Sequence, residues 1–263
     1  MKIMRNFENI NRIVIKVGTS TLTYENGSLN LRRIEQLARV ISDLQNSGKH
    51  IVLVSSGAIG VGAQKMGLDH RPTTVKGKQA AAAIGQAQLM EIYDEFFRQY
   101  NQLIGQVLLT HMVLTDDKMH QNAINTFQTL LEYNAIPIVN ENDTVVTDEI
   151  VFGDNDTLSA HIARMVDADL LIMLTDIDGL YDEDPNENLD AKLISEVNVI
   201  TDKIKQMAGG AGSNRGTGGM QTKLIAAEIA QGSSTKTVIM NGNNPTKIYD
   251  LLEGEKIGTY FDC

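Results

Sequence analysis

Short aliphatic runs alternate with longer amphipathic stretches along almost the entire chain. Such runs, bounded by polar turns, are typical of strands buried in a parallel sheet, whereas apolar residues three or four positions apart indicate helices. The predicted strands are 13–17, 51–54, 104–109, 136–139, 170–174 and 238–240, with an edge strand within 192–199. The predicted helices are 31–44, 80–100, 122–133, 158–166, 224–229 and 245–252.

The order of these segments predicts the fold class. Strands that alternate with helices build a parallel sheet, because parallel neighbours need a crossover connection. We therefore expect an α/β protein: a three-layer αβα sandwich with a central, mainly parallel sheet. No repeat or proline-rich linker divides the chain, and the weakest seam falls near residue 150. We expect a single domain over 1–263 with two lobes, about 1–150 and about 151–263.

Composition and charge limit the kinds of molecule that we expect the protein to bind. The chain has 263 residues and a formal net charge of −10, which argues against a broad nucleic-acid surface. Its single cysteine, Cys263, excludes an intrachain disulfide. Residues 1–11 lack the apolar core of a signal peptide, and no apolar run reaches a membrane-spanning length. We expect a cytoplasmic protein with no nucleic-acid or membrane partner.

A glycine-rich turn, Gly-Thr-Gly-Gly-Met-Gln-Thr-Lys at 216–223, leads directly into the predicted helix 224–229. Glycines let backbone N–H groups approach an anion, a helix start adds free donors, and Lys223 adds a full charge. These features suit a polyphosphate, although a glycine-rich turn that only caps the helix would have the same sequence pattern. The Walker A pattern is absent from the chain.

A second lysine, Lys16, lies inside the first apolar strand, two residues before Gly18. An unpaired lysine is costly to bury, so Lys16 either lies on an edge strand with its ammonium in water or serves a site. At the carboxyl end of a central strand it would reach the edge where open α/β sheets bind ligands. Lys16 and Lys223 together suggest a phosphoryl group held from two sides.

Four polar turns follow predicted strands or open a predicted helix, at 55–62, 140–143, 153–157 and 175–181. Each has a local explanation, since these residue types also populate tight turns, solvated loops and helix N-caps. As functional groups, 55–62 suits a carboxylate or phosphate, 140–143 an amine and a carboxylate, and 175–181 a ribose or base. The glycines and the proline of 57–77 predict a mobile flap.

Other chemistries find less support in the sequence. The five histidines are scattered and no Cys-x-x-Cys occurs, which makes a zinc site improbable. Neither Gly-x-Ser-x-Gly nor a Gly-x-Gly-x-x-Gly after the first strand is present, which disfavours a serine hydrolase and a dinucleotide-dependent oxidoreductase.

Taken together and in this order, over about 12–261, the motifs resemble the amino acid kinase family, and within it the glutamate 5-kinases. The resemblance implies transfer of the γ-phosphoryl group of ATP, with Mg²⁺, to the side-chain carboxylate of L-glutamate, the first step of proline biosynthesis. It implies glutamate in the first lobe, nucleotide in the second, and inhibition by L-proline at the glutamate site. It also implies a homo-oligomer, dimer or tetramer. Many bacterial members carry a further carboxyl-terminal PUA domain, so we expect a short form.

Residue roles follow from the resemblance, position by position. The catalytic group would be Lys16, Lys223 and Asp156, the lysines clamping the moving phosphoryl group and the aspartate holding both ammonium groups. Glutamate would be bound by Ser56, Gly57, Asn140, Asp143, Asp154 and Asn155. ATP would be bound by Lys16, Gly18, Thr175, Asp176, Thr217, Gly218, Gly219, Met220, Gln221, Thr222 and Lys223. No residue is assigned as a metal ligand.

Two alternatives stay open. Another kinase of the family, acting on acetylglutamate, aspartate, carbamate or UMP, would share both lysines and differ in the acceptor turns. UMP would call for basic residues beside Ser56 or Asn142, and the sequence has none there. A ligand-sensing member without catalysis should lack Lys16, Asp156 or Lys223, and all three are present.

Overall fold

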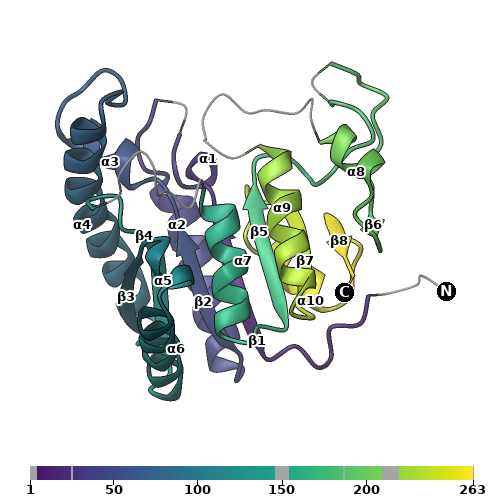
Figure 1. Ribbon diagram of the computed structural model, residues 1–263, viewed down its shortest axis with the longest axis horizontal. Helices are drawn as coiled ribbons and strands as arrows, with labels where there is room; N and C mark the ends of the chain where they lie inside the picture. Colours follow the sequence, from purple (N-terminus) through teal and green to yellow (C-terminus); the bar gives the residue numbers. More distant parts are fainter. Residues whose placement is uncertain (1–4, 25, 146–153, 186, 209–218, 263) are drawn as a thin grey trace.

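A computed structural model describes residues 5–24, 26–145, 154–185, 187–208 and 219–262 (Figure 1). Its strands are β1 (Arg12–Val17), β2 (His50–Ser55), β3 (Leu103–Leu109), β4 (Ala135–Glu141), β5 (Leu170–Thr175), β6 (Glu196–Val197), β7 (Lys236–Asn241) and β8 (Thr259–Phe261). Its helices are α1 (Thr19–Leu22), α2 (Leu31–Asn46), α3 (Ala58–Lys65), α4 (Val75–Gln99), α5 (Met112–Thr115), α6 (Asp117–Glu132), α7 (Asn155–Met165), α8 (Asp202–Met207), α9 (Met220–Gln231) and α10 (Lys247–Leu252).

The strands form one sheet in the order β3-β4-β2-β1-β5-β7-β8-β6. The five pairings from β3 to β7 are all parallel, and only β7 and β8 pair antiparallel. The carboxyl ends of β1, β2, β4 and β5 therefore meet at one edge of the sheet. The sheet confirms the predicted α/β class with a mainly parallel sheet.

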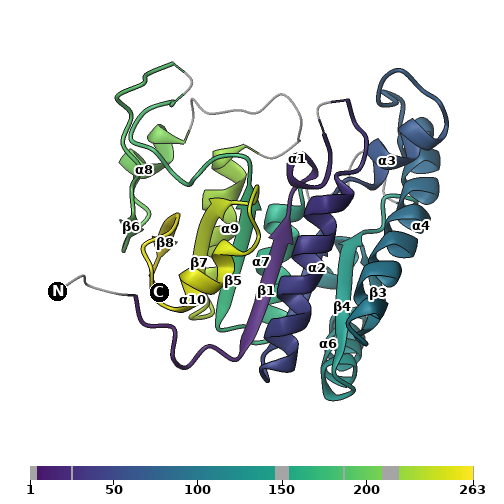
Figure 2. The ribbon, with the colours of Figure 1, turned by 180° about the vertical axis from the view of Figure 1, so that it is seen from behind.

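Helices cover both faces of the sheet and make the three layers. The side chains of β1 alternate: Ile13, Ile15 and Val17 pack with residues of α2, α4 and α10, whereas Val14 packs with residues of α6, α7 and α9. Figure 1 shows α6, α7 and α9 in front of the sheet, and Figure 2 shows α2 and α10 on the other side. By this alternation the side chain of Lys16 leaves β1 on the α7 face.

Local signals explain where the longer helices begin. The Asn30 side chain accepts a hydrogen bond from the Arg33 N–H and caps α2, and Thr74 caps α4 through the Gly77 N–H. The predicted helix at 80–100 is thus longer than expected and begins at Val75. Four short helices (α1, α3, α5 and α8) and β8 were not predicted, and the expected strand within 192–199 is reduced to β6.

The stretch 57–77, for which the sequence predicts a mobile flap, contains α3 and the first turn of α4. A Cβ atom on Gly62 would lie 1.7 Å from the Ala81 carbonyl oxygen, and one on Gly85 would lie 1.8 Å from the Ala58 carbonyl oxygen. These glycines therefore let the backbones of α3 and α4 touch. Within the described ranges, no helix is both long and apolar enough to span a membrane.

Candidate active site

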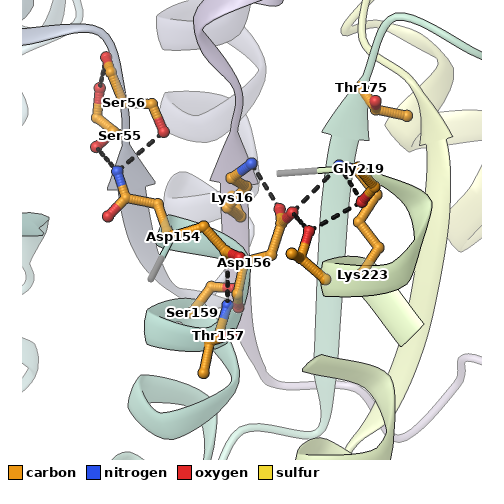
Figure 3. A network of polar contacts seen from close by, with 12 residues as sticks. Lys16, Ser55, Ser56, Asp154, Asp156, Thr157, Ser159, Thr175, Gly219 and Lys223 are labelled. Carbon is orange, nitrogen blue, oxygen red and sulfur yellow. Dashed lines mark hydrogen bonds and ion pairs between the residues drawn. The ribbon is translucent and has the colours of Figure 1, made fainter. Parts of the chain in front are cut away.

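A buried group of three charges lies at the carboxyl edge of the sheet (Figure 3). The carboxylate of Asp156 lies 2.6 Å from the ammonium of Lys16 and 3.1 Å from that of Lys223. All three side chains are less than a tenth exposed, and Asp156 is fully buried. The Thr222 hydroxyl donates to the same carboxylate at 2.8 Å. One aspartate thus holds together two lysines that are 207 positions apart in the sequence.

Three elements bring these groups together. Lys16 is the fifth residue of β1, a strand between β2 and β5, so it does not lie on an edge strand. Asp156 lies in the first turn of α7 and Lys223 in the first turn of α9, and these two helices pack against one another over the same face. The first turns of α7 and α9 therefore face the end of β1.

Asp156 stays charged near neutral pH, because its pKa is low. Burial alone would raise the pKa of Asp156, but the ammonium groups of Lys16 and Lys223 outweigh burial and bring that pKa down to about 2. Burial lowers the pKa of Lys223 from its ordinary value, against the attraction of Asp156. With both lysines protonated, the group has one positive charge left for an anion.

Two helices begin without a side-chain cap. The N-cap residues of α3 and α9 are Gly57 and Gly219, and neither makes a side-chain hydrogen bond to its helix start. Gly57 has φ = +99°, a conformation that other residues rarely adopt. Uncapped N–H groups at a helix start bind anions well. The N–H of Gly18 is instead engaged, because it donates to the Leu174 carbonyl at 3.4 Å.

A cluster of polar side chains, including two amides, surrounds Asn155, the residue next to Asp156. The Asn155 Nδ2 donates to Ser56 Oγ and to Asn140 Oδ1, each at 2.9 Å, and to the Ser55 carbonyl at 3.1 Å. These residues come from α7, from the end of β4 and from the turn after β2. The Oδ1 atom of Asn155 is buried and has no hydrogen-bond partner among the described residues. It is available to a donor on a ligand.

The three residues at the start of α7 make different contacts. Asp154 is the N-cap, and its side chain accepts from the Thr157 N–H at 2.8 Å, which is the local role considered for this turn. Asn155 bonds instead to the amide cluster through Ser56 Oγ. Asp156 points toward the ammonium groups of Lys16 and Lys223 (Figure 3). Burial raises the pKa of Asp154.

Asp143 lies in a turn just beyond β4. Desolvation raises its pKa to about 6. A carboxylate that is this costly to ionise in the free protein gains from a cationic ligand, because an ammonium group would stabilise its charged form.

The residues predicted to bind nucleotide lie on the α9 side. Thr175 ends β5, and its hydroxyl lies 3.1 Å from an Asp176 carboxylate oxygen. Gly219 is the N-cap of α9, a helix in which Met220 and Lys223 are buried and Gln221 is exposed. Thr217 and Gly218 lie outside the described residues.

Two residues of α4 that were not predicted from the sequence form hydrogen bonds to residues of this site. Gln86 and Tyr93, both on α4, bond to Asn140 Nδ2 at 3.0 Å and to Ser55 Oγ at 2.8 Å. They are seven positions apart, so they share one face of the helix. The sequence signal that could have identified them is a pair of polar residues seven positions apart on a helix face that is otherwise buried.

Comparison with known proteins places the chain. The model of the amino acid kinase family matches residues 11–241. A glutamate 5-kinase of Clostridium perfringens is 58% identical over 254 residues, which covers 95% of this chain and 94% of that protein. A glutamate 5-kinase of Listeria monocytogenes is 54% identical over 260 residues, covering 97% and 94%. The chain belongs to the amino acid kinase family, in its glutamate 5-kinase branch.

Solved structures of other kinases share the fold at much lower identity. The isopentenyl phosphate kinase of T. acidophilum superposes with a TM-score of 0.67 at 17% identity, covering 95% of this chain and 100% of that one. At that identity the likeness concerns the fold alone. The family resemblance expected from the motifs is confirmed, and so is the fold class.

Proposed function

We propose that this kinase transfers the γ-phosphoryl group of ATP to the side-chain carboxylate of L-glutamate, giving γ-glutamyl phosphate for proline synthesis. The names of its relatives support the substrate. The observation that carries the proposal is the contact of Asp156 with both Lys16 and Lys223, between uncapped helix N-termini and a cluster of amides.

The chemistry asks for positioning more than for acid–base catalysis. A carboxylate is already a nucleophile, so no general base is needed, but two anions must be brought together. Lys16 and Lys223 would neutralise the phosphoryl oxygens from two sides as the group moves. Asp156 would keep the two ammonium groups apart and oriented, and its low pKa keeps it ionised throughout.

Glutamate would occupy the amide side of the site. The free Oδ1 of Asn155 and the carboxylate of Asp143 suit an α-ammonium group. Ser56, Gly57 and Asn140 would complete the pocket, with Asp154 contributing mainly through its cap on α7. Asn155 follows residue 150 and so belongs to the proposed nucleotide lobe, yet it bonds to Ser56 of the proposed acceptor lobe, 1–150. One residue of the glutamate site would therefore come from the nucleotide lobe.

ATP would place its phosphates at the start of α9, with Thr175 and Asp176 nearer the nucleoside. The described residues fit this group, because an uncapped helix start and two lysines suit a polyphosphate. Among them, no group of three or more acidic, histidine or cysteine side chains is arranged so that it could hold a metal ion. Mg²⁺ is commonly held largely by substrate phosphates and water, and would neutralise phosphate charge here.

An ATP-dependent hydroxamate assay across L-glutamate, N-acetylglutamate and L-aspartate tests the proposal. Hydroxylamine traps an acyl phosphate, so colour reports the acceptor that was phosphorylated. We expect a product with glutamate and little with N-acetylglutamate, since the acetylated amide leaves the acidic partners without an ammonium ion. Comparable rates with glutamate and N-acetylglutamate would contradict the assignment.

A further inference from the structure

Gln86 is a polar residue buried in an alanine-rich part of α4, and it is outside the set of ligand-binding groups described above. Its side chain is 9% exposed, and its Oε1 accepts a hydrogen bond from Asn140 Nδ2 at 3.0 Å. Asn140 is itself 3% exposed. A buried amide that faces another buried amide must match a donor to an acceptor, because an unpaired polar group is costly.

The three amides form a chain with a fixed direction. The Ser55 carbonyl can only accept, so the Asn155 atom that faces it at 3.1 Å must be Nδ2. The atom of Asn140 that faces Asn155 must then be Oδ1, and this oxygen also accepts from the Glu141 N–H at 2.9 Å. Asn140 Nδ2 consequently faces α4, where it needs an acceptor.

This direction leaves one atom free at the end of the chain. The Asn155 Nδ2 is used by three acceptors, whereas its Oδ1 has no partner among the described residues although it is buried. The free atom is therefore an acceptor, and it suits the ammonium of an amino acid but not a second carboxylate.

The helix that carries Gln86 is packed closely against its neighbours. The backbone of α3 touches α4 at Gly85, the residue next to Gln86. The side chain of Tyr93, also on α4, places its hydroxyl 2.8 Å from Ser55 Oγ. Gln86 thus reaches Asn140 from a helix that is packed against α3 and that also contacts the end of β2, directly before Ser56.

We propose that Gln86 is a positioning residue for the amino-acid substrate: it acts through Asn140 to hold Asn155 with its free oxygen toward the substrate's α-ammonium group. The inference rests on the proposed function, because it takes glutamate as the ligand of Asn155. Gln86 needs to accept one hydrogen bond for this role, and its own NH₂ group is not required.

The test compares Gln86→Met, which cannot accept from Asn140 in the same way, with Gln86→Glu, which keeps an acceptor at that position. We expect Gln86→Met to raise the KM for glutamate by about 5- to 50-fold, the range for leaving a buried donor unpaired. The KM for MgATP should change less than twofold, which also shows that the variant is folded. Gln86→Glu should keep the glutamate KM within about threefold of the wild type.

Two controls separate positioning from general damage. Gln88→Met makes the same change two residues along α4, where the side chain bonds to Lys65 and Glu91, and it should leave both KM values unchanged. In an Asn140→Ala background, Gln86→Met should have no further effect, because the group through which it acts is gone.

Each other outcome has a definite meaning. An unchanged glutamate KM in Gln86→Met overturns the inference, as does an equal loss in Gln86→Glu or a full additional effect in the Asn140→Ala background. If the wild-type enzyme makes no glutamyl phosphate, the proposed function fails first, before the variants are compared.

Discussion

The ammonium group of Lys16, in β1, lies 2.6 Å from the carboxylate of Asp156, in the first turn of α7, and both side chains are buried. Burial removes both charges from bulk solvent, so each depends on the other. Lys223 adds a second ammonium group at 3.1 Å from the same carboxylate. Substitutions within this trio should therefore act as a unit, and not as three independent changes.

Replacing either lysine should damage turnover far more than nucleotide binding. In the proposed mechanism, Lys16→Ala and Lys223→Ala each remove a charge that would act mainly on the transferring phosphoryl group, by analogy with the loss of one oxyanion donor. We expect kcat to fall about 100- to 1,000-fold at saturating substrates, with a much smaller change in the KM for ATP. Steady-state kinetics of both variants measure this.

A matched control is Lys247→Ala, which removes an exposed lysine at the start of α10. It should leave kcat unchanged. Near-normal turnover in either Lys16→Ala or Lys223→Ala would remove that lysine from the catalytic group.

Asp156→Asn should cost stability as well as turnover. It leaves two buried ammonium groups without their shared carboxylate, and breaking a buried ion pair in this way costs about 3–5 kcal/mol. We expect the free energy of unfolding in urea to fall by about that amount, and MgATP to recover more stability in the variant than in the wild type. A variant as stable as the wild type without nucleotide would show that the lysines find other partners.

Much of the architecture could be predicted from the chain, because continuous aliphatic runs and helical periodicity are strong signals of a buried parallel sheet covered by helices. The lysine that interrupts the first apolar run could be singled out for the same reason, and in the fold Lys16 lies on the same face of β1 as Val14 and contacts Asp156. The short elements α1 and β8 were not predictable, because the surrounding packing decides their conformation and not local pattern.

The glycines of 57–77 show where the sequence is ambiguous. Glycine serves both flexible loops and close helix contacts, and nothing local distinguishes the two uses. Gly62 serves close packing, with Ala81 backbone where its Cβ would be. Gln86 was missed for a related reason, since a glutamine in an alanine-rich helix looks solvent-exposed until α4 is packed against the sheet.

Glutamate binding should weaken as the pH falls through about 6. Burial raises the pKa of Asp143 to about 6, so its carboxylate is charged above that pH and neutral below it. Only the charged form attracts an α-ammonium ion, and Asp156, with a pKa of about 2, does not titrate in this range. We expect the KM for glutamate to rise between about pH 7.5 and pH 5.

The control for this profile is Asp143→Asn, which removes the titrating group. Its KM for glutamate should be high at every pH in the range and nearly independent of pH. A variant profile that keeps the wild-type slope would assign the pH dependence to another group.

Free L-proline should inhibit in competition with glutamate. Proline keeps the α-carboxylate and α-nitrogen of glutamate, so it can use Asn155 and the turn 140–143 without supplying a reactive carboxylate. Initial rates with both ligands varied should show inhibition that disappears at high glutamate. Inhibition that saturating glutamate leaves undiminished would require a separate proline site.

The transfer itself is tested most directly with L-glutamate that carries ¹⁸O in both side-chain carboxylate oxygens, incubated with ATP, Mg²⁺ and hydroxylamine. If the carboxylate attacks the γ-phosphorus of ATP, one ¹⁸O becomes the bridging oxygen of the acyl phosphate. Hydroxylamine then attacks the carbonyl carbon, breaks the C–O bond and releases phosphate that keeps this oxygen. We predict inorganic phosphate with one ¹⁸O per molecule, seen by ³¹P NMR or mass spectrometry. Unlabelled phosphate, released at the same rate without glutamate, would show transfer to water and contradict the account.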